Sequence, residues 1–254
     1  MNKSVVVLLI VCGVFAGTAR QASAQTATWA DRGYINVGWG VESGSSAMSD
    51  IKTAPIYEET ASITSSSTFT SGSLFDVGVG LRIWKNLTVG AGYHQEQNDT
   101  EGTLTGTIPS PIFFNRPRQL NETVPGLERK ESAVHLQFGW VLPFSEKLDV
   151  LISGGPSFFR IEQDTVTNVT IGEQGGNFTT VLAQPTVTVQ KKSQTGYNVG
   201  ADATYIVWSN DSIRLGAGGF VRFTMADTTI PMLVNEQPTE VGGMQFGFGA
   251  RLRF

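Results

Sequence analysis

Apolar and polar residues alternate with a period of two along most of the chain. The pattern is clearest near the C-terminus, where Met244, Phe246, Phe248 and Leu252 alternate with glycine, glutamine and arginine. Strict alternation is typical of a β-strand with one apolar face, and nothing after residue 25 keeps a helical period over three turns. The same alternation predicts strands over residues 33–41, 74–83, 87–95, 132–142, 148–160, 196–207, 213–223 and 244–254.

The polar phase of these segments is rich in glycine, and this indicates what each face contacts. A water-soluble sheet would display long polar side chains outward, whereas small residues fit the crowded interior of a narrow barrel. About ten residues per strand is also the length that crosses a bilayer at a tilt. The predicted fold is therefore all-β: a single antiparallel up-and-down transmembrane β-barrel of eight strands, with its apolar face toward lipid.

The connections between the predicted strands are alternately short and long. Short turns are expected at 85–86, 143–147 and 209–212, and long connections at 42–72, 98–130, 161–194 and 225–240. Outer-membrane barrels show this asymmetry, with short periplasmic turns and long extracellular loops. Parts of the long connections, 166–170 and 185–190, alternate as well. They either extend the strands above the membrane or form an extra hairpin that makes ten strands.

Large aromatic residues gather near the short turns, where an interfacial girdle is expected in a membrane barrel. These residues are Trp84, Trp140, Phe144, Trp208 and Phe254. Trp84 and Trp208 fall out of phase with the outward residues, so alternation alone does not assign them to the girdle.

The N-terminus has the pattern of an export signal. Lys3 precedes an apolar stretch over 4–16, and Ala22-Ser23-Ala24 supplies a cleavage site. We therefore predict a cleaved signal peptide over 1–24, a short periplasmic segment over 25–32 that is too short to plug a barrel, and the barrel domain over 33–254. Cys12, the only cysteine, lies within the signal, so no disulfide or cysteine metal site is expected.

Composition narrows the class of protein further. Charged residues make up 16% of the chain, below the roughly 25% of a soluble domain. A mean hydropathy of −0.03 argues against several membrane-spanning helices. A pI near 5.3 and the lack of a Lys/Arg cluster argue against a nucleic-acid partner.

With these features the chain resembles the small bacterial outer-membrane β-barrel family, which includes OmpX/Ail, OmpW and the OmpA membrane domain. The resemblance rests on the export signal, the glycine-rich strands at 77–80 and 89–92, the segment 153–156 and the terminal alternating strand. It implies localisation in the bacterial outer membrane. It also implies that Phe246, Phe248, Leu252 and Phe254 form the signal read by the outer-membrane assembly machinery.

The inward phase of the predicted strands carries the candidate lumen residues. We expect a polar network inside the barrel made by Asp76, Arg82, His94, His135, Gln137, Asp149, Asp202, Arg214, Arg222, Arg251 and Arg253. Charges inside a narrow barrel are costly unless they are paired and hydrogen-bonded. The arginines are therefore expected to be partly neutralised by Asp149 and Asp202 and to block free passage.

Catalytic and cofactor chemistry is not indicated. The two histidines, His94 and His135, are in no His-x-Ser arrangement, and we expect neither to be catalytic. No compact acid cluster is expected beside them, so we predict no metal and no cofactor. Barrel enzymes acting on lipid A remain the least favoured class.

The long loops are the expected functional surface. Ile112-Phe113-Phe114 is an apolar tip in a polar loop. It either offers a contact to a ligand or, as we expect, folds back over the barrel mouth. The predicted function is a non-enzymatic, monomeric outer-membrane barrel with a structural or surface-interaction role toward an extracellular ligand or host surface. The alternative is a narrow OmpW-like channel for small solutes.

Overall fold

A computed structural model describes residues 29–70, 72–174, 178 and 180–254. The predicted signal peptide and residues 25–28 lie outside this part of the chain. In the part that is described, no helix is long and apolar enough to cross a membrane.

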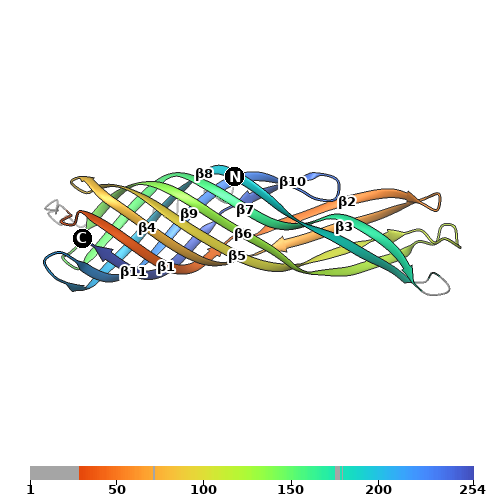
Figure 1. Cartoon of the computed structure of the whole chain (residues 1–254), viewed down its shortest axis with the longest axis horizontal. Helices are drawn as coiled ribbons and strands as arrows, with labels where there is room; N and C mark the ends of the chain where they lie inside the picture. Colours follow the sequence, from red (N-terminus) through yellow and green to blue (C-terminus); the bar gives the residue numbers. More distant parts are fainter. Residues whose placement is uncertain (1–28, 71, 175–177, 179) are drawn as a thin grey trace, which may run out of the picture.

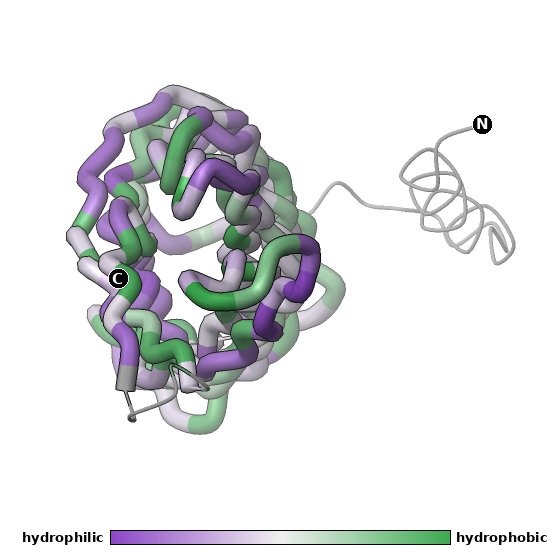
Figure 2. The backbone as a smooth tube through the Cα atoms, turned by 90° about the vertical axis from the view of Figure 1, so that its right-hand side faces the viewer, coloured by the Kyte–Doolittle hydropathy of each residue, from purple (hydrophilic) through white to green (hydrophobic). Residues whose placement is uncertain are grey.

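Antiparallel strands form almost the whole described structure (Figure 1). They are β1 (Gly33–Ser43), β2 (Ser46–Ile56), β3 (Glu59–Phe69), β4 (Gly72–Trp84), β5 (Leu87–Ile108), β6 (Arg118–Pro143), β7 (Leu148–Gln174), β8 (Thr180–Ser209), β9 (Arg214–Pro231), β10 (Glu236–Val241) and β11 (Met244–Arg253). Eight of them, β1, β4, β5, β6, β7, β8, β9 and β11, pair in that order, and β11 returns to β1. Figure 2 looks along this ring from the end that carries the long hairpins. The predicted eight-stranded antiparallel barrel is confirmed.

The apolar phase of the ring strands faces outward, as predicted. On β1, Ile35, Trp39 and Val41 are exposed, while Tyr34 and Asn36, which belong to the other phase, are buried. The same arrangement holds on the other ring strands, so an apolar band surrounds the barrel. Such a band suits lipid rather than water.

Strands continue through most of the regions that the sequence analysis assigned to long loops. At 166–170 and 185–190 they extend ring strands, which was one of the two expected alternatives; elsewhere the loop assignment was wrong. β5 and β6 run on past the apolar band and pair as far as Ile108 and Arg118, and β7 and β8 pair as far as Gln174 and Thr180. The β2–β3 hairpin pairs onto β5 through β3, and β10 pairs with β9. We call the described residues of 46–69, 95–131, 160–195 and 226–241 the outer extension. Its hairpins project to the right in Figure 1.

The two faces of a strand exchange character where the outer extension begins. On β5, exposed Tyr93 gives way to exposed Gln95 and Gln97, while the buried face changes from His94 to Leu104. The outside therefore turns from apolar to polar, and the inside turns from polar to apolar. A segment that leaves lipid for water needs a polar exterior and an apolar core. The polar outer face is why the sequence pattern resembled loops there.

Two aromatic residues that were out of phase are turned outward by irregularities. The register shifts between Arg82 and Trp84 in the β4–β5 pair and between Ile206 and Trp208 in the β8–β9 pair. A bulge adds a residue and re-aims the side chains that follow it. Trp84 and Trp208 are consequently exposed at the short-turn end, together with Trp140, Phe144 and Phe254.

The segment before β1 enters the barrel, although the sequence analysis judged it too short to act as a plug. Trp29 is 2% exposed and packs with Tyr34, Val141 and Leu151 inside the short-turn end. Its backbone N–H donates to Asn86 Oδ1 at 2.9 Å. The interior of an eight-stranded ring is only as wide as its side chains, so the buried indole fills part of the short-turn end.

Candidate functional site

Ion pairs cross the barrel interior near the short-turn end. Arg251 holds Asp202 with two hydrogen bonds, Nε to Oδ1 at 3.0 Å and Nη2 to Oδ2 at 2.7 Å. Arg253 Nη2 lies 3.4 Å from Asp149 Oδ1 and its Nη1 donates to Asn36 Oδ1 at 2.8 Å. Both arginine side chains are 1% exposed. These four charges, all expected in the lumen, lie together there.

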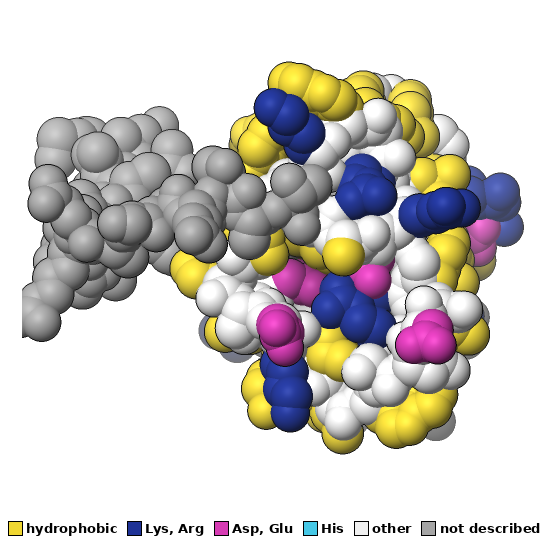
Figure 3. All heavy atoms as spheres, turned by 90° about the vertical axis from the view of Figure 1, so that its left-hand side faces the viewer, with side chains coloured by type: hydrophobic (Ala, Val, Ile, Leu, Met, Phe, Trp, Pro, Cys, Tyr) yellow, Lys and Arg dark blue, Asp and Glu magenta, His cyan; other side chains and the backbone are white. Residues whose placement is uncertain are grey.

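Two further predicted arginines bind the segment before β1 rather than a ring strand. Arg214 forms a two-point ion pair with Asp31, and Arg82 donates to the backbone carbonyl of Trp29. Both are half-buried, at the edge of the barrel. The end-on view shows basic and acidic side chains filling the middle of this opening (Figure 3).

The middle of the lumen holds another buried ion pair. Arg222 Nη1 lies 2.6 Å from Asp76 Oδ2, and both residues are buried. Gln137 Nε2 donates to Asn198 Oδ1 at 3.5 Å on the opposite wall. A cavity of about 20 Å³ is lined by Asp76, Gln137 and Arg222 among others, which is space for about one water molecule.

A chain of hydrogen bonds joins the two histidines farther along the lumen. His94 Nδ1 lies 2.7 Å from His135 Nε2, and His135 Nδ1 lies 2.7 Å from Ser157 Oγ. Asn198 Nδ2 donates to the same Ser157 oxygen at 2.9 Å. Both histidines have zero exposure, and their rings stack with centroids 4.9 Å apart. Both rings are surrounded by protein groups, and neither lies at the rim of the barrel.

The structure places acidic residues beside His94, so the expectation that no compact acid cluster lies there was wrong. Glu42, Glu96 and Glu131 are buried at this level, and Arg129 pairs with Glu131 at 3.1 Å. Each glutamate lies one residue beyond a predicted strand end and on its inward phase. Extending the strands at 41, 95 and 132 by one residue would have identified all three.

An apolar core closes the lumen at its outer end. It lies inside the outer extension and contains Met48, Ala61, Ile63, Phe69, Leu104, Ile108, Leu120, Val124, Leu127, Val166, Val169, Val181, Ile230, Met232 and Leu233. Leu104, Ile108 and Ile230 have zero exposure. The polar interior thus lies between this core and the Trp29 cluster at the other end.

The expectation that the apolar loop tip folds back over the barrel mouth was wrong, because the tip is exposed to solvent. Ile112, Phe113 and Phe114 are 55%, 56% and 72% exposed at the end of the β5–β6 hairpin. Arg116 lies over the Phe113 ring at 5.8 Å from its centroid. The hairpin strands continue to Ile108 and from Arg118, so the tip is held away from the mouth.

The residues expected to form the assembly signal lie on the outer face of β11 and directly after it. Phe246, Phe248 and Phe254 are exposed there, and Leu252 is half-buried between them. The backbone N–H of Phe254 donates to Gly33 O at 3.1 Å, and Gly33 N–H donates to Phe254 O at 2.9 Å. The C-terminal residue therefore also helps to close the ring.

Comparisons with known proteins give one family match and two remote structural likenesses. A family model described as outer membrane protein beta-barrel domain matches residues 9–254, while a comparison with curated protein sequences gives no match. Among solved structures, Neisserial surface protein A is 13% identical, with 87% of this chain and 97% of that chain covered and a TM-score of 0.41. The outer membrane protein OprG from Pseudomonas aeruginosa is 10% identical, with 88% and 96% covered and a TM-score of 0.39. Because the family model spans nearly the whole chain, this protein belongs to the outer membrane protein beta-barrel domain family and resides in the bacterial outer membrane.

Proposed function

We propose that this protein is a non-enzymatic outer-membrane barrel with a closed lumen, and that it works through the surface of its outer extension. The observation that carries this proposal is the filled interior. The Arg251–Asp202, Arg253–Asp149 and Arg222–Asp76 pairs cross the lumen. An eight-stranded barrel leaves room for side chains and little more.

Two further features support a closed lumen over a narrow channel. The Trp29 cluster fills the periplasmic end, and the apolar core of the outer extension fills the other. A polar solute would have to displace both, and it would lose its hydration inside the apolar core. A channel for small solutes therefore requires a rearrangement of one end at least.

The environment of the histidines supports a non-enzymatic role. A general base must come within hydrogen-bond reach of a substrate proton. His94 and His135 are fully buried and hydrogen-bonded to each other, so a lipid at the rim does not reach them.

The outer extension offers the surface for partners. Its hairpins reach well beyond the apolar band (Figure 1), and the exposed tip Ile112–Phe114 is the kind of apolar patch that marks a contact site. We propose an extracellular ligand or host surface as the partner class. The eight-stranded ring leaves no unpaired edge at the level of the membrane, which supports a monomer.

Single-channel recording of the refolded protein in a planar bilayer tests the closed lumen. We expect no steady conductance from the folded protein, with a general porin in the same bilayer as the positive control. Heat-modifiable migration on a gel verifies that the recorded sample is folded. A large and steady conductance would overturn the proposal and favour the channel.

A further inference from the structure

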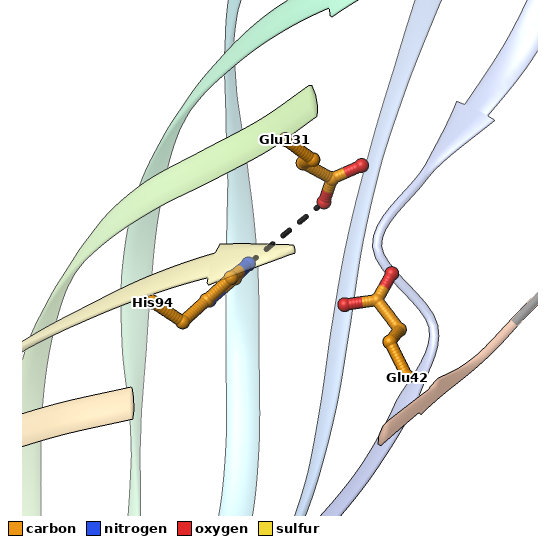
Figure 4. A group of neighbouring side chains, drawn as sticks. All are labelled: Glu42, His94 and Glu131. Carbon is orange, nitrogen blue, oxygen red and sulfur yellow. Dashed lines mark ion pairs between the residues drawn. The ribbon is translucent and has the colours of Figure 1, made fainter. Parts of the chain in front are cut away.

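Three buried side chains from different strands converge in the lumen at the level where the outer extension begins. They are Glu42 of β1, His94 of β5 and Glu131 of β6, and one ligand atom of each lies within 4.8 Å of the others. Figure 4 shows the two carboxylates and the imidazole pointing toward one another. The group is buried on all three strands, unlike an acidic patch on a surface.

One atom of this group lacks the partner that burial demands. Glu131 Oε2 accepts from Arg129 at 3.1 Å, but Oε1 has no hydrogen-bond partner and the residue has zero exposure. This Oε1 faces His94 Nε2 at 3.9 Å. Leaving a buried carboxylate oxygen unpaired is costly, so the position calls for a cation.

The charge balance points the same way. Glu42 and Glu131 are buried at the same level as a third carboxyl, that of Glu96. Among the described residues, Arg129 is the one cation paired with any of these three carboxyl groups. The nearby guanidinium of Arg222 is held by Asp76 at 2.6 Å. Buried charge needs compensation, and two carboxylates remain in excess.

His94 is oriented as a metal ligand usually is. Its Nδ1 hydrogen-bonds with His135 Nε2, and His135 in turn bonds with Ser157. When His94 donates from Nδ1, its Nε2 has a lone pair, and the Glu131 oxygen lies 3.9 Å from this nitrogen. The amide nitrogen of Gln245 lies 3.4 Å from it and also donates to Glu42 Oε2 at 2.7 Å, so this amide has to move aside when an ion binds. A ligating histidine typically makes such a bond with its other nitrogen, which sets its tautomer and its direction.

We propose that Glu42, His94 and Glu131 bind one divalent transition-metal ion, with Zn²⁺ as the best fit. One imidazole and two carboxylates suit Zn²⁺ with a water as fourth ligand, whereas Ca²⁺ and Mg²⁺ prefer sites made of oxygen alone. A tetrahedral site with bonds near 2.0 Å brings its ligand atoms to about 3.3 Å from one another. The ligand atoms, which lie within 4.8 Å of one another, therefore have to move closer together when the ion binds. The expectation of no metal site rested on the glutamates that the sequence analysis had missed.

The position of the site determines how the ion is loaded. The Trp29 cluster and the apolar core close the lumen on either side of it. We expect the ion to enter while the barrel folds, and to exchange slowly afterwards. This inference does not depend on the partner of the outer extension.

Metal analysis of refolded protein tests the site. The chain is stripped of metal while unfolded, refolded in detergent with Zn²⁺, dialysed and measured by mass spectrometry of the metal. We expect about one zinc per folded chain, and X-ray absorption showing one nitrogen ligand with oxygen ligands. Folding is checked by heat-modifiable migration. Folded wild-type protein that holds no zinc would overturn the proposal. That result would mean that protons, and not a metal ion, neutralise the carboxylates.

Matched variants test the assignment to these residues. Glu131→Gln and His94→Gln should each weaken zinc binding about tenfold or more. Glu96→Gln, a buried neighbour outside the group, should leave one zinc per chain. Equal zinc content in the folded Glu131→Gln and His94→Gln variants would place the ion elsewhere and overturn the assignment. If either variant fails to fold, the absorption spectrum of the wild-type protein decides.

Discussion

At the residue scale, the stability of the barrel depends on ion pairs in the lumen. Removing either partner of such a pair is expected to be destabilising. Asp202 binds the Arg251 guanidinium with two hydrogen bonds at 3.0 and 2.7 Å, and Arg251 is almost wholly buried. Asp202→Ala would leave that guanidinium without a counterion. Breaking such a pair costs about 3–5 kcal/mol, so the urea midpoint for unfolding from lipid vesicles should fall clearly.

An exposed ion pair provides the control for this prediction. Lys130 and Glu128 lie 3.1 Å apart on the surface, with side chains about half exposed. Exposed pairs contribute roughly 0–1 kcal/mol, so Glu128→Ala should barely move the midpoint. Equal shifts for Asp202→Ala and Glu128→Ala would mean that water screens the lumen pair.

Asp50 closes a seam in the outer extension. β2 pairs only with β3, and β10 only with β9, so no ladder joins β2 to the β9–β10 turn. Asp50 bridges them, because Oδ2 accepts from the N–H groups of Val234 and Asn235 at 2.7 and 2.9 Å. Burial alone would raise the pKa of Asp50, but the hydrogen bonds from Asn235 and Val234 outweigh it and lower the pKa below its usual value.

This bridge should depend on pH in one direction. A lowered pKa means that Asp50 stabilises the seam fully above about pH 4, and that the stabilisation is lost as the pH falls through its folded-state pKa. Asp50→Asn should loosen the seam at neutral pH by about 1–3 kcal/mol. Hydrogen exchange at the Val234 and Asn235 amides measures both effects. Unchanged exchange in the variant at pH 7 would contradict the bridge.

At the element scale, each long strand passes from lipid to water, and its outward residues mark the boundary. Leu136 on β6 lies between outward Val134 and Phe138. Val189 on β8 also points outward. It pairs with Asp164 and lies farther from the membrane than Lys191, which pairs with Glu162. Arginine at mid-bilayer costs about 2–4 kcal/mol, and near or beyond the interface about 0–1.

Leu136→Arg should therefore destabilise the barrel in lipid, whereas Val189→Arg should be nearly neutral. Urea titrations in vesicles compare the two variants directly. Similar costs for both would place the membrane boundary elsewhere on the strands.

The end of the last strand has a structural role, and the sequence analysis predicts a targeting role for it as well. Deleting Phe254 would also remove its backbone bonds with Gly33, so a substitution separates the roles better. If the aromatic ring is the assembly signal, Phe254→Ala should slow membrane insertion in cells while refolding in vitro is unchanged. Phe144→Ala, another exposed aromatic at the short-turn end, is the control. Cell fractionation measures insertion. Normal insertion of the Phe254→Ala variant would argue against the aromatic ring as an assembly signal.

At the scale of the whole molecule, the barrel consists of two cores of opposite character stacked along one axis. The membrane part has an apolar outside and a charged inside, with Arg222 and Asp76 paired near its centre. The outer extension has a polar outside and an apolar inside. Each arrangement follows from the solvent around it. In water, apolar side chains are more stable inside the protein, whereas in lipid they are equally stable on the outside.

The alternation by itself determined the eight ring strands, their inward and outward faces and most lumen residues, because a period of two assigns every side chain to a face. His94, Arg222 and Asp76 lie inside as their phase predicted. The outer extension was hidden, because its polar outward residues resemble those of a loop.

Only the tertiary structure decided which groups meet across the lumen. Asp31 pairs with Arg214, 183 residues away in sequence, and Trp29 reaches Asn86. Glu42, His94 and Glu131 likewise converge from three strands. Phase along a strand says that a side chain points inward, but the partner it meets depends on the stagger and closure of the whole ring, which no single segment of sequence contains.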